Sequence, residues 1–239
     1  MILYFVLEHP DDNDLLLDIL EDAAEMYPID KSRVYIAGHS HNGHYSLEFA
    51  SRHPKTIAAV TTYGNFPGFP QSDECSDAVI VSDEKMNYRS TLDMPLINIS
   101  GYCENGCMFP INRDAENLRP GQARKRPRSF ESRARSWQRR LKASNCPMKS
   151  LKEIAAVAES PDRATRMLGI PNDKNETLYV DGCEHYIADI KNNNGKYHLR
   201  MVGIENTPHT PTPFGLNLSW SFMKRFARDT ENGAVQELY

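Results

Sequence analysis

Apolar residues in the first hundred positions follow two distinct spacings. Short continuous apolar runs, which indicate strands buried on both faces, occupy residues 2–9, 33–38, 57–63 and 95–101. Apolar residues at helical spacing occupy residues 13–26 and 42–52, and Pro28 and Pro54 follow them. Strands that alternate with helices in this way predict an α/β fold, with a mostly parallel sheet flanked by helices.

The second half of the chain predicts further helices and an antiparallel hairpin. Helical spacing recurs over residues 129–144 and about 148–168, with a restart at Pro161, and in a closing helix at about 216–229. Strands are predicted at residues 177–181, 186–191 and 197–205. The sequence Asn192-Asn193-Asn194-Gly195 is a strong turn signal between the last two strands. The tail after Asp229 is predicted to fray.

The length of 239 residues suits one domain. We expect its core to comprise about residues 1–101 and 176–230, with a helical cap inserted at about 102–170. Within this insertion, residues 113–142 contain 11 of the 28 Lys and Arg residues and three acidic ones. A solvated lid face explains this basic segment, and attraction of anionic substrates is the alternative. Its few aromatic residues argue against nucleic-acid binding.

Composition excludes several other classes of protein. The net charge of −4 provides no overall basic field for nucleic acid. No apolar run approaches the ~20 residues that a membrane span needs. The apolar start at Ile2–Leu7 lacks a basic leader and a cleavage site, so we interpret it as a strand of a cytoplasmic protein. If the natural N-terminus lies further upstream, a signal peptide there would allow secretion.

The five cysteines are sparse and are not spaced like zinc ligands. Reduced thiols are therefore expected. A Cys103–Cys107 or Cys75–Cys107 bridge is the alternative.

A strand, a tight turn and a helix meet at Ser40. The apolar strand ends at Gly38, Ser40 stands at the apex, and the helix-forming run follows Asn42 and Gly43. This order is typical of a nucleophile elbow, in which the turn exposes the serine hydroxyl above the positive end of the next helix. Asn42 stands where the motif has its second glycine, and asparagine tolerates left-handed backbone better than most residues. The structural alternative is a turn serine that caps the helix.

A nucleophilic serine needs a histidine base, and the base needs a carboxylate to orient it. In α/β-hydrolases these residues follow the chain order Ser, acid, His. Ser40, Glu104 and His209 fill this order. Asp114 is the alternative acid.

Other histidines are weaker candidates. His185 and His198 lie in the hairpin strands and are alternative bases. Three histidines surround the serine: His39, His41 and His44. No carboxylate or cysteine pattern supports a metal site there. We instead expect His39, His41 and Asn42 to shape the substrate pocket, with the backbone N–H of His41 as an oxyanion donor.

The segment Tyr27–Ser40, with the sequence YPIDKSRVYIAGHS, resembles the elbow of α/β-hydrolases of the polyhydroxybutyrate-depolymerase-like and feruloyl-esterase-like family. Further similarity lies in the segments 50–54 and 95–101, in the spacing from Trp137 to Cys146, and around His209. The resemblance implies a serine esterase of α/β-hydrolase fold. It places the acid three residues beyond Gly101, at Glu104, where the family usually has Asp.

The chain starts at what resembles the family's fourth strand. We therefore expect an N-terminally truncated hydrolase fold without the loop that supplies the second oxyanion donor. Strand 2–9 would then have an open edge, which we expect to pair with a preceding segment or with a second copy of the chain.

The sequence thus predicts a carboxylic-ester hydrolase without cofactor or metal, acting on a small or polymer-linked ester. A prolyl-oligopeptidase-like peptidase uses the same fold and residues and is the enzymatic alternative. A truncated, inactive domain that serves as a binding or assembly module is the alternative outside enzymes. Residues 64–94 and 102–170 carry no signature of acyl or alcohol specificity.

Overall fold

The computed structural model describes residues 12–64, 93–103 and 130–239. Up to residue 101 the described elements are α1 (Asp12–Met26), a short 3₁₀ turn η1 (Lys31–Arg33), β1 (Val34–His39), α2 (His41–Arg52), β2 (Ile57–Tyr63) and β3 (Leu96–Gly101). They confirm the helices and strands predicted between residues 13 and 101. The predicted strand 2–9 lies outside the described residues.

The remaining described elements are α3 (Phe130–Ala143), α4 (Leu151–Ala156), η2 (Val157–Glu159), α5 (Arg163–Leu168), β4 (Lys174–Val180), β5 (Cys183–Lys191), β6 (Tyr197–Ile204), α6 (Pro213–Met223), β7 (Phe226–Arg228) and β8 (Val235–Glu237). The predicted hairpin is confirmed, since β5 and β6 pair antiparallel around the turn at Asn192–Gly195. The segment predicted as one helix with a restart at Pro161 forms α4, η2 and α5.

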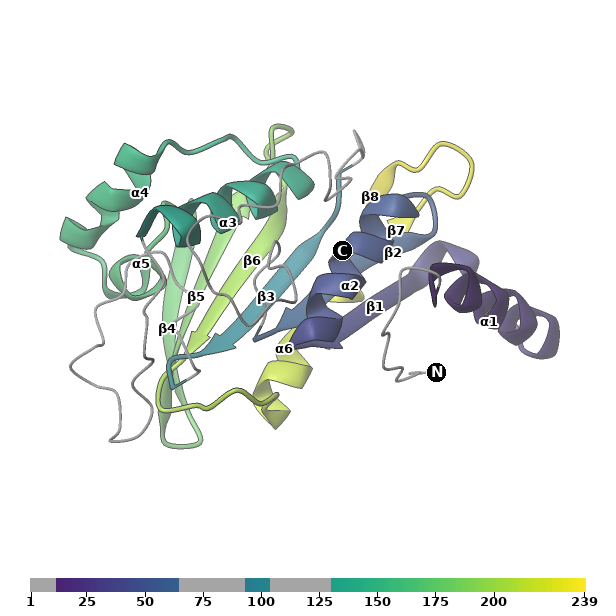
Figure 1. Ribbon diagram of the computed structural model, residues 1–239, viewed down its shortest axis with the longest axis horizontal. Helices are drawn as coiled ribbons and strands as arrows, with labels where there is room; N and C mark the ends of the chain where they lie inside the picture. Colours follow the sequence, from purple (N-terminus) through teal and green to yellow (C-terminus); the bar gives the residue numbers. More distant parts are fainter. Residues whose placement is uncertain (1–11, 65–92, 104–129) are drawn as a thin grey trace.

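Six strands form one twisted sheet in the order β1-β2-β3-β6-β5-β4 (Figure 1). The pairs β1–β2, β2–β3 and β3–β6 are parallel, whereas β5 and β4 continue the sheet antiparallel. The expected α/β class with a mostly parallel sheet is therefore correct. Because the first four strands in this order run the same way, their carboxyl ends meet at one edge of the sheet.

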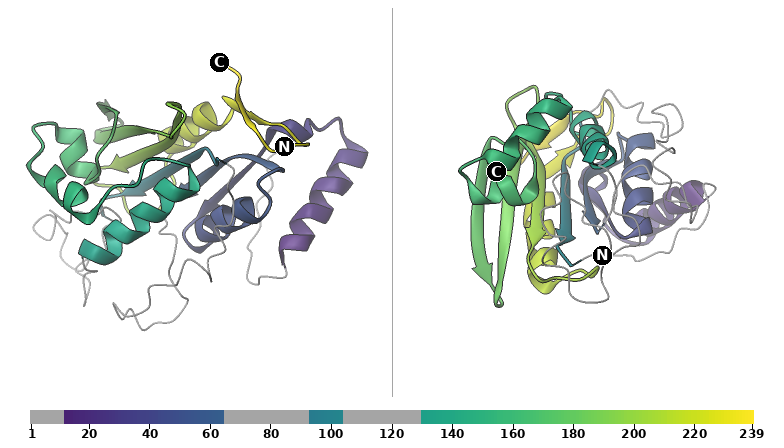
Figure 2. Two further views of the ribbon diagram at one scale, coloured as in Figure 1. Left: turned by 90° about the horizontal axis from the view of Figure 1, so that it is seen from above. Right: turned by 60° about the vertical axis from the view of Figure 1, so that its left-hand side comes forward.

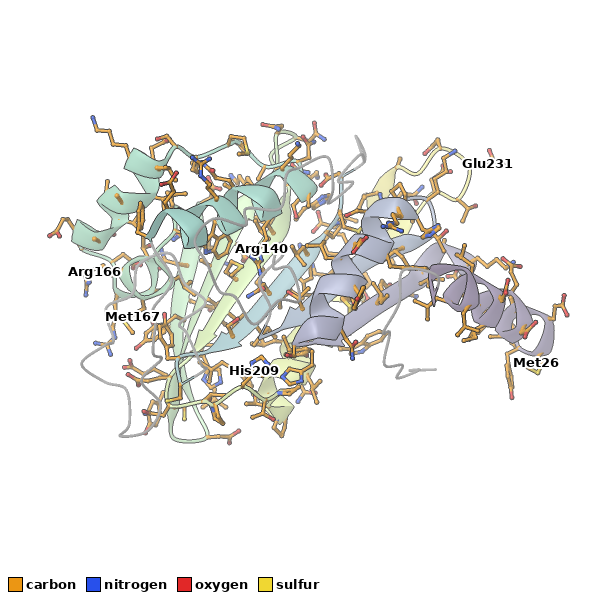
Figure 3. The ribbon with its side chains drawn as sticks, viewed as in Figure 1. Met26, Arg140, Arg166, Met167, His209 and Glu231 are labelled. Atoms are coloured by element: carbon orange, nitrogen blue, oxygen red, sulfur yellow. The ribbon has the colours of Figure 1, made fainter. Side chains whose placement is uncertain are left out.

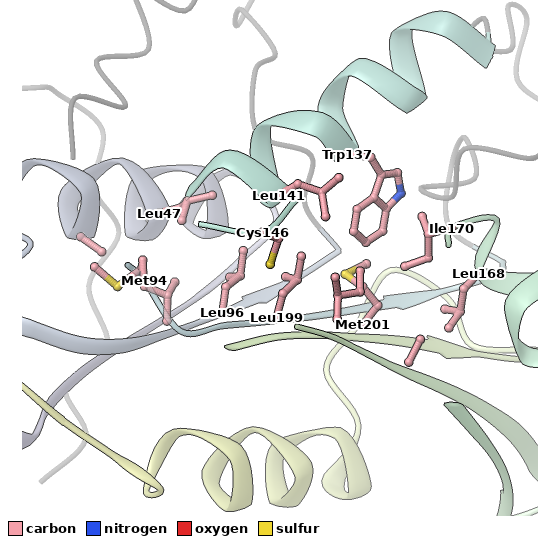
Figure 4. Close-up of a cluster of buried hydrophobic side chains, with 14 of the residues drawn as sticks. Leu47, Met94, Leu96, Trp137, Leu141, Cys146, Leu168, Ile170, Leu199 and Met201 are labelled. Carbon is pink, nitrogen blue, oxygen red and sulfur yellow. The ribbon is translucent and has the colours of Figure 1, made fainter. Parts of the chain in front are cut away.

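Helices cover both faces of the sheet. Figure 2 shows α2 and α3 on one face and α6 on the other. Leu47 of α2 and Trp137 and Leu141 of α3 pack on the strands in the larger buried cluster (Figure 4). Phe222 of α6 and Phe226 belong to a second cluster on the opposite face. All residues of β2 and β3 are buried, which explains their continuous apolar sequences.

The predicted cap falls partly outside the described residues, because 104–129 are not described. The described part of that insertion contributes to the main core, since Trp137 of α3 is 1% exposed. Arg140 of the same helix is also buried and donates a 2.8 Å hydrogen bond to Asn98 Oδ1 in β3. A cap over the site stays a prediction, whereas α3 is a covering helix of the sheet.

The predicted closing helix and frayed tail are wrong at their boundaries. The helix begins earlier, because Thr212 Oγ1 accepts a 3.0 Å hydrogen bond from Gly215 N and Pro213 occupies the first turn. It ends at Met223, and β7 and β8 then form an antiparallel hairpin. Asp229 stabilises the intervening turn by accepting hydrogen bonds from the backbone of Glu231 and Asn232.

Arg228, at the end of β7, ties this hairpin to the main sheet. Its side chain is 1% exposed and donates to the backbone carbonyls of Ile57, Asp93 and Gly233 at 3.0, 2.9 and 2.8 Å. Burial lowers the pKa of the guanidinium to about 10. These hydrogen bonds join the starts of β2 and β3 to the C-terminal hairpin.

We expect Arg228→Met to lower the free energy of unfolding by about 3–5 kcal/mol, because each buried carbonyl left without a donor costs about 1–3 kcal/mol. Arg52→Met is the control, since Arg52 is exposed and pairs with Glu48 one turn earlier on α2. Its loss should be about 0.5 kcal/mol or less. Urea unfolding of both variants measures the difference, and equal losses would contradict the role of Arg228.

Candidate active site

Ser40 is the single residue between β1 and α2. Its backbone has φ 57° and ψ −123°, a conformation that an L-residue adopts only under strain. The surrounding backbone holds it there: Ser40 N donates to Tyr63 O at 2.8 Å, and Ser40 O accepts from Gly43 N at 3.1 Å. The chain thus turns sharply from strand to helix, as the sequence predicted.

Gly38 makes this turn sterically possible. A Cβ atom at this position would lie 2.2 Å from Asn42 O and 2.4 Å from Ser46 Oγ. Only glycine lets the first turns of α2 lie so close to β1. Asn42 itself belongs to α2, so the residue with positive φ at the elbow is Ser40 and not Asn42. Replacement of the motif's second glycine by asparagine is therefore compatible with the turn.

The side chain of Ser40 does not cap the helix. Ser40 occupies the N-cap position of α2, yet its hydroxyl accepts no hydrogen bond from the backbone of the first helical turn. The alternative of an ordinary capping serine is thus wrong. Ser40 stands at the positive end of α2, directly before His41, whose backbone N–H as that of the first helical residue has no carbonyl partner within the helix.

His209 lies in the connection between β6 and α6. This connection passes close over the end of β3, where Cys103 N donates to Thr207 O at 2.9 Å and Tyr102 N donates to Ile204 O at 3.0 Å. A Cβ atom on Gly101 would lie only 2.2 Å from Thr207 O. Gly101 therefore provides the space in which the connection crosses the end of the strand.

This path brings His209 to the residue that precedes Ser40. The rings of His39 and His209 lie 4.6 Å apart between centroids, with an interplanar angle of 39°. His209 is exposed and lies at the edge of the sheet where the parallel strands end (Figure 3). His209 thus contacts the residue next to Ser40, although β2 and β3 separate β1 from β6 in the sheet.

Several predicted site residues lie outside the described part of the chain. Glu104 follows directly on the described segment 93–103, and Asp114 lies further into the undescribed stretch. The choice between them as the acid stays a prediction. The backbone of His41 is described and its side chain is not, so a pocket role for its imidazole also stays a prediction.

Of the two alternative bases, His198 lies at the opposite edge of the parallel strands, whereas His185 pairs with Ile204 at the end of β6. His198 is the second residue of β6 and lies at the amino end of the parallel strands, where its Nδ1 pairs with Asp93 Oδ2 at 2.8 Å. His185 is 2% exposed, and its ring meets the ring of Phe214 edge-on at 4.7 Å. Burial lowers the pKa of His185, although the 3.2 Å contact of Nδ1 with Cys183 O acts in the opposite direction. His198 thus lies away from the elbow, whereas the choice of His209 over His185 as the base stays a prediction.

The sequence interpretation missed two supports of the site, Tyr63 and Gly101. The carbonyl of Tyr63 fixes the elbow, and Gly101 admits the connection that carries His209. The sequence contains a signal for the role of Gly101. A glycine that ends a buried strand at the ligand-binding edge often marks a close approach of another backbone segment.

The described residues contain no group of three or more His, Cys, Asp or Glu side chains arranged to hold a metal ion. None of the helices in the described part of the chain is long and apolar enough to cross a bilayer. Cys146 and Cys183 are free thiols, and burial raises the pKa of Cys146 to about 12. Cys75 and Cys107, the partners in the alternative bridges, lie outside the described residues.

Comparison with known proteins supports the fold. No protein-family model matches the chain, and no curated protein matches its sequence. Among solved structures, the chain is similar to an acetyl xylan esterase from Aspergillus awamori, with a TM-score of 0.52 and 11% identity, over 89% of this chain and 67% of that one. The chain therefore has an α/β fold that resembles an esterase fold. The narrower resemblance to polyhydroxybutyrate-depolymerase-like enzymes stays a prediction.

The strain at Ser40 predicts an unusual order of stabilities. We expect Ser40→Gly to exceed Ser40→Ala in free energy of unfolding by about 1 kcal/mol, because relief of about 1–3 kcal/mol of strain outweighs the greater chain entropy of glycine. Ser51, inside α2, is the control and should show the reverse order. Urea unfolding measures all four variants, and the same order at both positions would contradict a strained elbow.

Burial of neutral His185 predicts a loss of stability in acid. Its folded-state pKa is lowered, so its contribution to stability is complete above the unfolded pKa of about 6.5 and is lost as pH falls from there towards the folded pKa. His185→Gln should therefore lose less free energy of unfolding than the wild type between pH 7 and 5. Unfolding curves across this range test it, with His53→Gln as control. Parallel curves for wild type and His185→Gln would reject it.

Proposed function

We propose that this chain is a serine hydrolase that cleaves carboxylic esters through an acyl-enzyme. The observation that carries the proposal is the strained turn at Ser40, whose hydroxyl does not cap α2 and which lies beside the ring pair formed by His39 and His209. Strain of this kind persists where function requires it. The position at the carboxyl ends of parallel strands, where α/β proteins bind ligands, supports the same conclusion.

In the first half of the reaction, Ser40 Oγ attacks the ester carbonyl while His209 takes the hydroxyl proton. The carbonyl oxygen becomes an oxyanion, which the backbone N–H of His41 at the positive end of α2 stabilises. Collapse of the tetrahedral intermediate breaks the bond to the alcohol oxygen. His209 returns its proton to that oxygen, and the alcohol departs. The acyl group remains bound to Ser40 as an ester.

In the second half, water attacks the acyl-enzyme. His209 takes a proton from the water, the same N–H stabilises the second oxyanion, and Ser40 leaves with the proton that His209 returns. Glu104 is the proposed acid that orients His209, with Asp114 as the alternative. The second oxyanion donor is not assigned. The mechanism uses no cofactor and no metal.

The substrate class follows from the reaction and from the structural neighbour. The neighbour is an acetyl xylan esterase by its name, so a short acyl group on a sugar polymer is one form of the proposed substrate. The proposal covers small and polymer-linked esters alike, because the residues that would select acyl and alcohol groups lie largely in the undescribed segments.

The decisive experiment measures hydrolysis of p-nitrophenyl acetate by the wild type, Ser40→Ala and His209→Gln. Both variants should lose about 10²–10⁴-fold in kcat, because each removes an essential partner of the proton transfer. Equal rates in wild type and Ser40→Ala would reject the esterase proposal. Thermal unfolding of each variant is the control for folding.

Two further probes separate the alternatives. A fluorophosphonate that labels Ser40 without ester turnover would indicate a nucleophile with an incomplete oxyanion site. Preferential cleavage of a prolyl p-nitroanilide would instead favour the peptidase alternative. No labelling and no turnover of either substrate would leave a binding or assembly role.

A further inference from the structure

We infer that His39 is a positioning residue that fixes the plane of the His209 imidazole. The inference rests on the proposed function of His209 as the base for Ser40. The direct observation is the ring contact between His39 and His209, with centroids 4.6 Å apart and planes inclined by 39°.

Strand alternation places His39 on the face of the sheet that α6 covers. In β1, Val34 and Ile36 pack against the cluster on the α2 face, whereas Tyr35 packs against the cluster on the α6 face. Tyr35 also donates to Phe226 O at 2.8 Å and meets the ring of Trp220 in α6 edge-on. Successive side chains point to opposite faces, so His39 shares the side of Tyr35. The connection that carries His209 enters α6 on this same side.

Backbone hydrogen bonds hold the connection on both sides of His209. Thr207 O is bonded to Cys103 N before it, and Thr212 caps α6 after it. Between them, Thr210 N donates to Pro208 O at 2.8 Å, which tightens the turn around His209. The imidazole itself is on an exposed residue. A ring in such a position needs a side-chain contact to restrict its rotation.

Hydrogen bonds alone do not supply this restriction. The nitrogens of an imidazole lie in the ring plane, so bonds to a nucleophile and to an orienting carboxylate both use the edge of the ring. A ring bonded at its two nitrogens can still tilt about the line that joins its partners. A second ring against its face opposes this tilt and leaves both nitrogens accessible. The tilted contact with His39 has this form.

The position of His39 directly before Ser40 lets its ring hold His209 in a fixed place relative to the serine. His39 precedes Ser40 and is the last residue of β1, where it is paired in register with Tyr63 of β2. Its backbone is thus held in the pairing of β1 with β2, directly before the elbow. The ring of His39 is therefore held in place relative to Ser40, so a displacement of either residue displaces the other.

The test compares His39→Ala, which removes the ring, with His39→Phe, which keeps a flat face and carries no proton or hydrogen-bonding group. With p-nitrophenyl acetate, His39→Ala should lower kcat about 10–100-fold, because small displacements of a catalytic group cost this much. Its KM should stay within about twofold of the wild type, as expected for a residue that acts on the transition state alone. His39→Phe should recover most of kcat.

His53→Ala is the matched control. The ring of His53 packs on Phe49 with centroids 4.6 Å apart and an interplanar angle of 40°, at the other end of α2 from Ser40. This variant removes a histidine from nearly the same ring geometry and should keep wild-type kcat and KM. Thermal unfolding should show all three variants folded at the assay temperature.

Two kinetic results would overturn the inference. One is a kcat for His39→Phe as low as that of His39→Ala, which would assign a polar role to His39. The other is a change confined to KM, or no change at all, in His39→Ala.

Histidine-ring NMR resonances give a readout that does not depend on turnover. Resonances of His209 should move in His39→Ala and stay near their wild-type positions in His53→Ala. If the wild type and Ser40→Ala hydrolyse the ester equally slowly, the esterase proposal fails, and the NMR shift alone then decides whether His39 orients His209. Unmoved His209 resonances would reject the ring contact in solution.

Discussion

The reversal of the chain at Ser40 is the constraint on which the candidate site depends. One residue connects a strand to a helix, so the helix must begin directly above the end of the strand. This close approach excludes any side chain at Gly38. The strained backbone is held by a hydrogen bond to Tyr63, at the end of the neighbouring strand. The proposed nucleophile therefore has its geometry only when β1 and β2 are already paired, and the sheet and the candidate site form together.

The site also joins the two helical layers. Ser40 leads into α2 on one face of the sheet, and His209 leads into α6 on the other. Their meeting point is at the edge where the parallel strands end, so neither layer contains the site alone. Gly101 makes the second approach possible in the same way that Gly38 makes the first possible, through the space that a missing Cβ leaves. Two glycines at strand ends thus allow the close backbone approaches on which the turn at Ser40 and the connection that carries His209 depend.

The sequence predicted the local elements well and their long-range contacts less well. Periodicity located the strands and helices between residues 13 and 101, because each depends on residues close in sequence. The order of Ser40 and His209 followed from the elbow pattern and the resemblance. The contact of His39 with His209 was not predicted, since it depends on how a distant connection crosses β3. The closing helix was extended too far, because the apolar residues of β7 continue its spacing and the turn signal at Asn232-Gly233 was not used. Glu104 lies beyond the described residues, so its assignment still rests on chain order.

The pairing of β3 with β6 has a consequence for the assembly of the chain. Leu96 is paired with Leu199, and the two strands belong to parts of the sequence that are synthesised far apart in time. Until β6 emerges from the ribosome, one side of β3, which is buried along its whole length in the folded chain, lacks its partner. Long-range parallel pairing of this kind slows folding and exposes strand edges that favour aggregation. The same arrangement that collects the strand ends at one edge thus makes the nascent chain dependent on its last third.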